Sequence, residues 1–440
     1  MMTDECQFSS ASIFQGSGSD VRRHTRPGAP AAVLPGQEPW LVAKAVIGTG
    51  PQPTTAMNPI FAELPTTIFE VMSRHARDTG AVNLGQGFPD DPGPEDVRRK
   101  AAEAVIEGWN QYPPMMGLPE LRHAVSEHYR HWQALDFDPE AEVMITSGAT
   151  EALAGALLAL IEPGDEIVLF EPMYDAYLPL VRRAGGIPRF VTLKPPRFAL
   201  TEEALAQAFG PRTRAVLFNN PLNPAATLFS PEDLDLLASF CRRFDAIAIC
   251  DEVWEHVVFD GRRHQPLMSC EGMWERTIKI GSAGKIFNLT GWKVGFVCAA
   301  PAIMRVLAKA HQFLTFTTPP NLQAAVAYGL MKEDGYFESL RRDLARSRDR
   351  FTTGLTDLGF DVIPSEGTYF LNIDIARFGD ADDVAFCRRL VLEHGVAAIP
   401  VSAFYAEGAV KNVVRFCFAK RDETLDAALE RLSGVVRQAA

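Results

Sequence analysis

Residues 277–295 read TIKIGSAGKIFNLTGWKVG, an apolar strand candidate that runs directly into a loop rich in glycine, serine and lysine. A lysine in such a loop, here Lys285, is a candidate Schiff-base amine if burial or a nearby cation keeps part of it unprotonated near neutral pH. Lys293 and Ser282 could together grip a phosphate. An ordinary surface loop with two lysines is the alternative reading of this stretch.

Short apolar segments and helical segments alternate on both sides of this loop. Helical periodicity marks 95–108, 118–132 and Glu151–Ile161. Several strand candidates are apolar throughout, as in strands that helices cover on both faces. Such alternation predicts an α/β domain with a mostly parallel sheet. The strand candidates are Glu142–Thr146, Glu166–Phe170, Ala215–Asn219, Ala246–Cys250, Thr277–Gly281 and Val294–Ala299.

The pattern changes after about residue 330, which predicts a second, smaller α+β domain. A long charged helix, Glu333–Leu358, precedes the strand candidates Tyr369–Ile375 and Val413–Phe418 and a helix near Leu425–Gln438. We expect a large domain over 101–330 and a small C-terminal domain over 331–440, with the N-terminal segment 57–100 as part of the small domain. Residues 1–56, rich in Gly, Pro, Ser and Ala, are expected to form a disordered extension, and Met57 is an alternative start.

Composition argues against several classes of partner. The net charge is −12 and no cluster of Lys and Arg dominates, which argues against nucleic-acid binding. No apolar run approaches the roughly 20 residues that span a bilayer, and Met1–Glu5 do not resemble a secretory signal. The seven cysteines are scattered without CxxC spacing, which favours reduced thiols in a cytoplasmic protein over disulfides or a metal site.

Two further motifs follow strand candidates, where ligands of α/β proteins bind. Asp251 ends an apolar run and could pair with a pyridine nitrogen, keeping that nitrogen protonated. A helix-capping aspartate is the alternative. The run TSGATE at 146–151 could offer backbone N–H groups and a helix N-terminus to a phosphate, or could simply contain a Ser or Thr N-cap.

Two more polar residues stand in unusual surroundings. Asn223, in NNPLNP at 219–224, could donate to a phenolic oxygen of a cofactor, although Asn-Pro also favours turns. Arg415, in VRFCF at 414–418, is costly to bury without an anion, so a carboxylate clamp would suit it. An outward-pointing arginine on an edge strand is the alternative.

The order and spacing of these motifs resemble the class I, fold-type-I aminotransferases that depend on pyridoxal phosphate (PLP). Within that family the chain resembles the group of kynurenine aminotransferase, glutamine transaminase K and methionine aminotransferases. The match extends from about Phe69 to Phe418. The runs that carry it are VNLGQGFPD at 82–90, NQYPPMMG at 110–117, ITSGATEAL at 145–153, FEPMYDAY at 170–177, NNPLNP at 219–224, DEVW at 251–254, MWERTIKIGSAGK at 273–285, TGWKVGF at 290–296, AIPVSAFY at 398–405 and VRFCFAK at 414–420.

The resemblance implies a role for each matching residue. Lys285 would bind PLP covalently and move protons, and Asp251 would pair with the pyridinium nitrogen. Arg415, assisted by the Gly87 backbone, would hold the substrate α-carboxylate. The other implied positions are Asn223 at the ring oxygen and near the substrate, Tyr174 on the ring face, Ala149, Thr150, Ser282 and Lys293 at the phosphate, Phe69 and Phe316 in the side-chain pocket, and Tyr112 reaching the phosphate from the partner subunit of a homodimer.

Two positions depart from the family pattern. Trp254 stands where the family usually has a tyrosine that hydrogen-bonds the ring oxygen of the cofactor. An indole N–H could donate to the same oxygen, but the ring is larger and differently oriented. Thr317 stands where kynurenine aminotransferases often have histidine, which weakens a specific prediction of kynurenine as the substrate.

The activity that this resemblance implies is a ping-pong transamination. The amino donor would be an apolar, aromatic, glutamine-like or methionine-like amino acid, and the acceptor a 2-oxo acid. A β-eliminating cysteine-conjugate lyase and an N-succinyldiaminopimelate aminotransferase are alternatives on the same site. A PLP-sensing transcription regulator is a remote alternative, because residues 1–56 offer no helix-turn-helix pattern.

Overall fold

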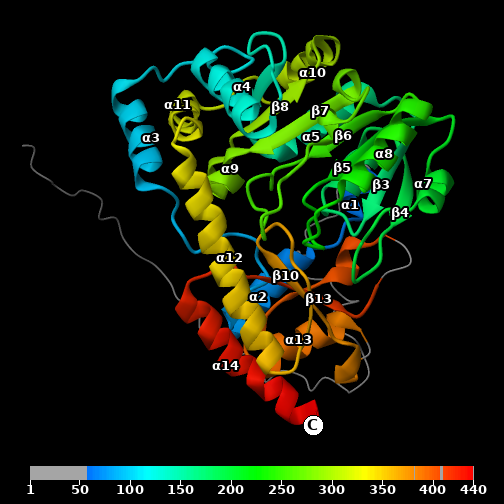
Figure 1. Ribbon diagram of the computed structural model, residues 1–440, viewed down its shortest axis with the longest axis vertical. Helices are drawn as coiled ribbons and strands as arrows, with labels where there is room; N and C mark the ends of the chain where they lie inside the picture. The colour runs from blue at the N-terminus through cyan, green and yellow to red at the C-terminus, as the bar shows by residue number, and fades with distance from the viewer. Residues whose placement is uncertain (1–56, 381, 407–409, 440) are drawn as a thin grey trace, which may run out of the picture. The chain divides into compact units, whose positions relative to one another are not determined.

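The computed structural model describes residues 57–380, 382–406 and 410–439, so the extension predicted over residues 1–56 lies outside the described part. Within that part, the strands form a seven-stranded sheet, a four-stranded sheet and a separate two-stranded pair (Figure 1). Helices alternate with the strands of the larger sheet along the chain. The α/β class predicted from the sequence is therefore confirmed.

The larger sheet has the strand order β2-β8-β7-β6-β5-β3-β4. All neighbouring strands are parallel except β8, which runs antiparallel to both β2 and β7. As a result, β2, β7, β6 and β5 all end at the same edge of the sheet. The bounds are β2 Val143–Thr146, β3 Glu166–Glu171, β4 Ile187–Thr192, β5 Thr213–Asn219, β6 Ile247–Asp251, β7 Thr277–Ser282 and β8 Gly295–Ala299.

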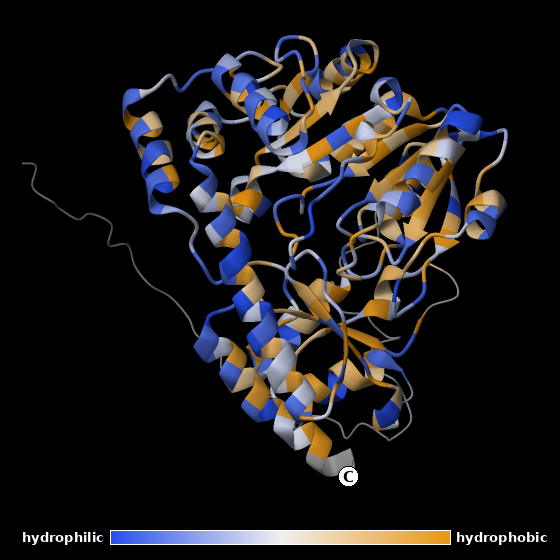
Figure 2. Ribbon diagram, in the orientation of Figure 1, coloured by the Kyte–Doolittle hydropathy of each residue, from blue (hydrophilic) through white to orange (hydrophobic). Residues whose placement is uncertain are grey.

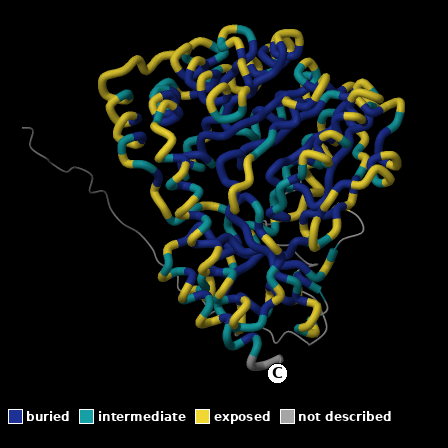
Figure 3. The backbone as a smooth tube through the Cα atoms, in the orientation of Figure 1, coloured by how far each residue is buried: buried dark blue, intermediate teal, exposed yellow. Residues whose placement is uncertain are grey.

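Helices cover both faces of the larger sheet, because its side chains alternate between two hydrophobic cores. In β6, Ile249 packs into a core shared with α5, α6 and α10, whereas Ala248 and Cys250 pack into a core shared with α7 and α8. The strands are accordingly apolar and buried (Figures 2 and 3). The covering helices are α4 Pro119–Gln133, α5 Gly148–Leu160, α6 Tyr177–Arg183, α7 Glu202–Ala208, α8 Pro231–Arg243 and α10 Pro301–Leu314.

The smaller sheet is antiparallel, with the order β12-β13-β10-β9. In the two-stranded pair, β1 is parallel to β11, which joins the N-terminal segment to the C-terminal part of the chain. We propose the division into 57–100, 101–330 and 331–440 on this basis. The bounds are β1 Val82–Asn83, β9 Asp361–Ile363, β10 Phe370–Asp374, β11 Val396–Ala397, β12 Ile399–Pro400 and β13 Val413–Cys417.

The remaining helices begin and end at recognisable signals. Thr67 caps α2 by accepting from the Glu70 N–H, and Gly80, with φ of 65°, ends it. These helices are α1 Pro59–Ala62, α2 Ile68–Thr79, α3 Glu95–Glu107, α9 Ala283–Ile286, α11 Pro320–Leu330, α12 Asp334–Asp357, α13 Asp383–Glu393 and α14 Asp422–Ala439. Short 3₁₀ helices span Leu267–Ser269, Trp274–Arg276, Thr290–Trp292, Ala376–Phe378 and Val401–Phe404. In the described part of the chain, none of the helices has the length and apolar character needed to cross a bilayer.

Two differences from the sequence prediction have physical reasons. Strand β4 was not predicted; it contains Pro188 and mostly solvent-accessible side chains, which an edge strand tolerates because one side of its backbone needs no partner. Helix α5 begins at Gly148 instead of Glu151. Gly148 has a φ of 75°, a conformation that favours glycine, so the chain turns from β2 into α5 earlier than the apolar periodicity indicates.

A buried cluster of charged side chains lies next to β6 and β7. Lys279, on β7, is completely buried and donates to the carboxylates of Glu252 and Glu255, at 2.9 Å from Glu255 Oε2. Tyr129 and Gln133 also donate to Glu255. Burial opposes the ammonium charge, but the two carboxylates raise the pKa of Lys279 above its ordinary value. Each charge in the cluster therefore depends on the others for the solvation that water would otherwise supply.

We expect Lys279→Met to lower the free energy of unfolding by about 3–5 kcal/mol, because it leaves two buried carboxylates without their cation. Urea denaturation of the full-length chain measures the loss. Lys309→Met makes the same change at an exposed lysine of α10, where less than about 0.5 kcal/mol is expected. Equal losses in the two variants would show that the cluster contributes nothing specific.

Candidate active site

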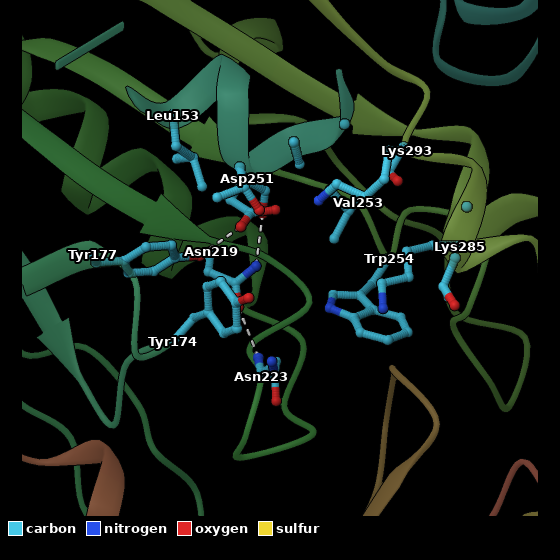
Figure 4. Close-up of a pocket in the computed structure, with 16 residues that line it drawn as sticks. Leu153, Tyr174, Tyr177, Asn219, Asn223, Asp251, Val253, Trp254, Lys285 and Lys293 are labelled. Carbon is cyan, nitrogen blue, oxygen red and sulfur yellow. Dashed lines mark hydrogen bonds between the residues drawn. The ribbon is translucent and has the colours of Figure 1, made fainter. Parts of the chain in front are cut away.

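A cavity opens at the edge where β2, β5, β6 and β7 end (Figure 4). Because the carboxyl ends of these strands meet there, residues far apart in the sequence line one space. Nine of the residues predicted for the site line the cavity: Ala149, Thr150, Tyr174, Asn223, Asp251, Trp254, Ser282, Lys285 and Lys293.

Asp251 is the last residue of β6 and is buried with one carboxylate oxygen unpartnered. Its Oδ2 accepts a hydrogen bond from Tyr177 Oη at 2.6 Å, while Oδ1 has no partner. Burial raises the pKa of Asp251, although the Tyr177 hydrogen bond lowers it in part. A turn, not a helix, follows Asp251, so the capping alternative is wrong. The free oxygen is suited to accept a hydrogen bond from a protonated ring nitrogen.

Lys285 lies on α9, the short helix that directly follows β7. Its Nζ donates to Tyr369 Oη at 3.0 Å and lies 4.5 Å from the centre of a Trp254 ring. Burial lowers the pKa of Lys285 to about 8, with the Asp251 carboxylate opposing part of that effect. Roughly a tenth of this amine is therefore unprotonated at pH 7, far more than for an ordinary lysine, which suits a nucleophilic lysine.

Another part of the cavity wall is built from the turn between β2 and α5. The side chain of Lys293 packs against Gly148, where an added Cβ would lie 3.3 Å from Lys293 Nζ. A Cβ on Gly295 would lie only 2.6 Å from the Gly148 backbone, so these two loops approach closely because both residues are glycine. Ser147 precedes α5 without capping it through its side chain. Lys293, Ser282 and the N-terminus of α5 thus line one space, which suits a phosphate.

Arg415 is buried in β13 without an ion-pair partner among the described residues. Its Nη1 donates to Asn223 Oδ1 at 2.8 Å and its Nη2 to the Gly85 carbonyl at 3.1 Å, while Nε has no partner. Burial lowers the pKa of Arg415 to about 10. Because β13 lies between β12 and β10, the edge-strand alternative is wrong. A buried guanidinium of this kind is suited to a carboxylate.

Aromatic rings enclose the Arg415 guanidinium. Its central carbon lies 5.3 Å from the ring centre of Phe69, 3.8 Å from that of Phe370 and 5.3 Å from that of Phe404. Phe69, which was predicted for the side-chain pocket, therefore lies beside Arg415. These rings exclude water from much of the surroundings of this cation, which strengthens its attraction for an anion.

Five of the predicted residues do not line the cavity: Arg415 and Phe69, described above, and Tyr112, Phe316 and Gly87. Tyr112 is 79% exposed and Phe316 is 39% exposed, and their rings contact each other with centres 5.4 Å apart. Neither lines the cavity within the single chain. The Gly87 carbonyl accepts from Tyr369 Oη at 2.6 Å, whereas the carbonyl that contacts Arg415 is that of Gly85.

Three supporting residues were not predicted from the sequence. Tyr177 holds Asp251, and Asn219 accepts from the Asn223 N–H at 2.8 Å and donates to the Asp251 carbonyl at 2.7 Å. Tyr369 accepts from Lys285. Tyr177 and Asn219 belong to the motifs FEPMYDAY and NNPLNP, and membership of these motifs is the sequence signal that could have identified them. Tyr369 had no such signal beyond its place in a strand candidate.

The residues present fit a PLP molecule. The unpartnered Asp251 Oδ1 meets the requirement of a pyridinium nitrogen, and the glycine-lined turn with Lys293 meets that of a phosphate. Lys285, with its lowered pKa, supplies the amine. In the described part of the chain, no group of three or more His, Cys, Asp or Glu residues is arranged to hold a metal ion.

Comparisons with known proteins agree with this chemistry. The family model described as aminotransferase class I and II matches residues 79–432. The solved structure of N-succinyldiaminopimelate aminotransferase from Mycobacterium tuberculosis superimposes with a TM-score of 0.84 at 45% identity, covering 86% of this chain and 100% of that one. Methionine aminotransferase of Escherichia coli is 39% identical, over 84% of this chain and 96% of its own. Human kynurenine–oxoglutarate transaminase 1 is 38% identical, over 81% and 93%.

The lowered pKa of Lys285 predicts an unusual pH dependence of its reactivity. Since only the unprotonated amine reacts, labelling of Lys285 in the full-length chain should rise through about pH 8 and level off above about pH 9. Peptide mass spectrometry after brief treatment with an acylating reagent measures the rate at each pH. Ordinary exposed lysines should keep gaining reactivity up to about pH 10. A Lys285 profile that follows theirs would contradict the prediction.

Proposed function

Because the chain belongs to the class I and II aminotransferase family, and is therefore a PLP-dependent transaminase, we propose that its amino donor is an apolar, aromatic, glutamine-like or methionine-like amino acid. The acceptor is a 2-oxo acid, and the two substrates react in turn by a ping-pong mechanism. The observation that carries the donor proposal is the buried Arg415 guanidinium, which has phenylalanine rings on several sides.

We assign the chemical roles to residues that face the cavity. When bound, PLP supplies an electron-poor ring that stabilises negative charge developing on the donor carbon. Lys285 would bind the cofactor covalently. Once released, its amine would take the proton from the donor carbon and give that proton to a different carbon. Asp251, held by Tyr177, keeps the ring nitrogen protonated. The lowered pKa of Lys285 supports this role, because a proton-transfer group works best with a pKa near the working pH.

The remaining cofactor contacts follow from the same arrangement. Ala149, Thr150, Ser282 and Lys293 hold the phosphate, and Tyr174 covers a face of the ring. Asn223 and the Trp254 indole N–H donate to the ring oxygen. Both residues line the cavity, and Figure 4 shows the Trp254 side chain between Lys285 and Asn223.

Arg415 binds the α-carboxylate of the donor and Gly87 assists through its backbone. The guanidinium is already oriented by Asn223 and Gly85, so little freedom is lost when a carboxylate binds. The phenylalanine side chains around it, Phe69 among them, favour donors whose side chains are apolar or aromatic. Phe316 contributes to the same side-chain pocket.

A second candidate donor is N-succinyldiaminopimelate. The observation that favours it is the 45% identity to the solved aminotransferase of Mycobacterium tuberculosis that is named for that substrate. Such a donor carries additional carboxylates, which need hydrogen-bond donors or cations beyond Arg415.

We also propose that the active form is a homodimer in the cytoplasm. The exposed, mutually contacting rings of Tyr112 and Phe316 are suited to completing the site of a partner subunit. The six cysteines in the described part of the chain are buried free thiols, as is usual in a reducing compartment.

A donor panel tests the substrate proposal. We expect methionine, glutamine and phenylalanine to convert the bound cofactor at least about tenfold faster than aspartate, because the surroundings of Arg415 are apolar. Single-turnover absorbance spectroscopy of the PLP-loaded enzyme measures each rate, with Lys285→Ala as the inactive reference. N-succinyldiaminopimelate as the best donor would favour the second candidate, and aspartate as the best donor would contradict both. Pyruvate and ammonia released from a cysteine conjugate without a 2-oxo acid would instead indicate β-elimination.

Complementation tests the contribution of Tyr112 across a dimer. We expect Tyr112→Ala and Lys285→Ala to be strongly impaired alone, and a mixture of the two that has exchanged subunits to regain about a quarter of wild-type activity. Half of the dimers are then hybrids, and each hybrid has one intact site. No recovery after verified subunit exchange would mean that Tyr112 acts within its own chain or not at all.

A further inference from the structure

Tyr369 has a hydroxyl group whose two hydrogen bonds run in a fixed direction. It precedes β10 and is completely buried. Its Oη donates to the Gly87 carbonyl at 2.6 Å and accepts from Lys285 Nζ at 3.0 Å. A phenol carries one proton, so when its O–H points at the Gly87 carbonyl its oxygen can only accept from the lysine. Burial raises the pKa of Tyr369 well above its ordinary value, so the hydroxyl keeps this proton.

The ring of Tyr369 is fixed from several sides. It meets the Trp254 ring edge to face, with centres 4.3 Å apart, and the Phe370 ring at 5.1 Å. Its carbonyl accepts from the Phe418 N–H at 3.1 Å. Lys285 Nζ thus lies between a hydroxyl oxygen and an indole face, and both belong to tightly packed residues.

Resting on the role proposed above for Lys285, we propose that Tyr369 is a positioning residue for the free lysine amine. Its hydroxyl receives an N–H of Lys285 and holds the amine beside the Trp254 ring whenever the amine is not bound to the cofactor. Since the Gly87 carbonyl accepts the hydrogen bond from Tyr369 Oη, the position of the Gly87 segment is transmitted to the lysine.

The direction of these hydrogen bonds determines how Tyr369 affects proton transfer. An oxygen that only accepts stabilises the ammonium form of Lys285 more than the neutral amine. Burial acts the other way by favouring the neutral form. Among the charged and titratable neighbours of the amine, Asp251 and Cys417 raise the pKa of Lys285, whereas Arg415 and Lys293 lower it. Tyr369 therefore limits how far burial lowers the pKa of Lys285, and keeps it near 8 instead of closer to neutral.

The same short segment supports both reactive cations. The Gly85 carbonyl accepts from Arg415, and two residues later the Gly87 carbonyl accepts from Tyr369. Gly87 has no room for a side chain, because a Cβ there would lie 2.7 Å from the Phe370 ring. Through Tyr369, residues 85–87 set the position of Lys285, from the larger sheet, relative to Arg415, from the smaller one.

The test is Tyr369→Phe in the full-length chain, which removes the hydroxyl and keeps the ring. We expect the midpoint of Lys285 labelling against pH, measured without added cofactor, to fall by about one pH unit. Tyr405→Phe is the matched control: its hydroxyl, bonded to the Leu193 carbonyl at 2.8 Å, is buried elsewhere, and its loss should leave the midpoint unchanged. An unchanged or raised midpoint in Tyr369→Phe would overturn the proposal.

Folding and function are checked separately. Circular dichroism establishes whether Tyr369→Phe is folded. If it is not, Tyr369→Leu, which lacks the same hydroxyl, takes its place and is judged by the same shift in the labelling midpoint. PLP uptake by the wild-type chain is followed by its absorbance. Failure of uptake would refute the proposed role of Lys285, whereas the labelling midpoint in the absence of PLP decides the role of Tyr369.

Discussion

The parallel register of β5, β6 and β7 is the constraint on which the site depends. It pairs Asn219 with Asp251, and Asp251 with Ile280, so that the strands end together. Asp251, Asn219 and the Lys285 helix are then held by backbone hydrogen bonds and not by mobile loops. A shift of one residue would turn the Asp251 side chain to the other face of the sheet and separate it from the cavity. The apolar side chains above and below the sheet make such a shift costly.

Buried charge is the second feature that shapes this molecule. Asp251, Lys285 and Arg415 are buried. Burial favours the neutral form of each group, so it raises the pKa of Asp251 and lowers the pKa values of Lys285 and Arg415. Lys279 is buried as deeply, yet its two carboxylates keep it charged. The two kinds of site differ in their partners: Lys279 has its counter-ions, whereas Asp251 Oδ1 and Arg415 Nε have no hydrogen-bond partner.

Trp254 illustrates how one departure from a family pattern is accommodated. The indole is buried and packs edge to face against Tyr369, whose hydroxyl reaches Lys285. A tyrosine at position 254 would bring its own hydroxyl into this space. In this chain the hydroxyl next to the lysine belongs to Tyr369, which precedes β10 of the smaller sheet and donates to the Gly87 carbonyl. The packing of the two aromatic rings thus links the turn after β6 to the segment that leads into β10.

The sequence by itself determined the α/β class, the alternation of strands and helices, and the motifs with Lys285 and Asp251, because apolar periodicity and strand-end position are local properties of the chain. It did not determine β4, the start of α5, or the supporting residues Tyr177 and Tyr369. Their roles arise from contacts such as Tyr177 to Asp251 and Tyr369 to both Gly87 and Lys285. Only the tertiary structure decides such contacts, because they depend on which distant segments pack together and how deeply each polar atom is buried.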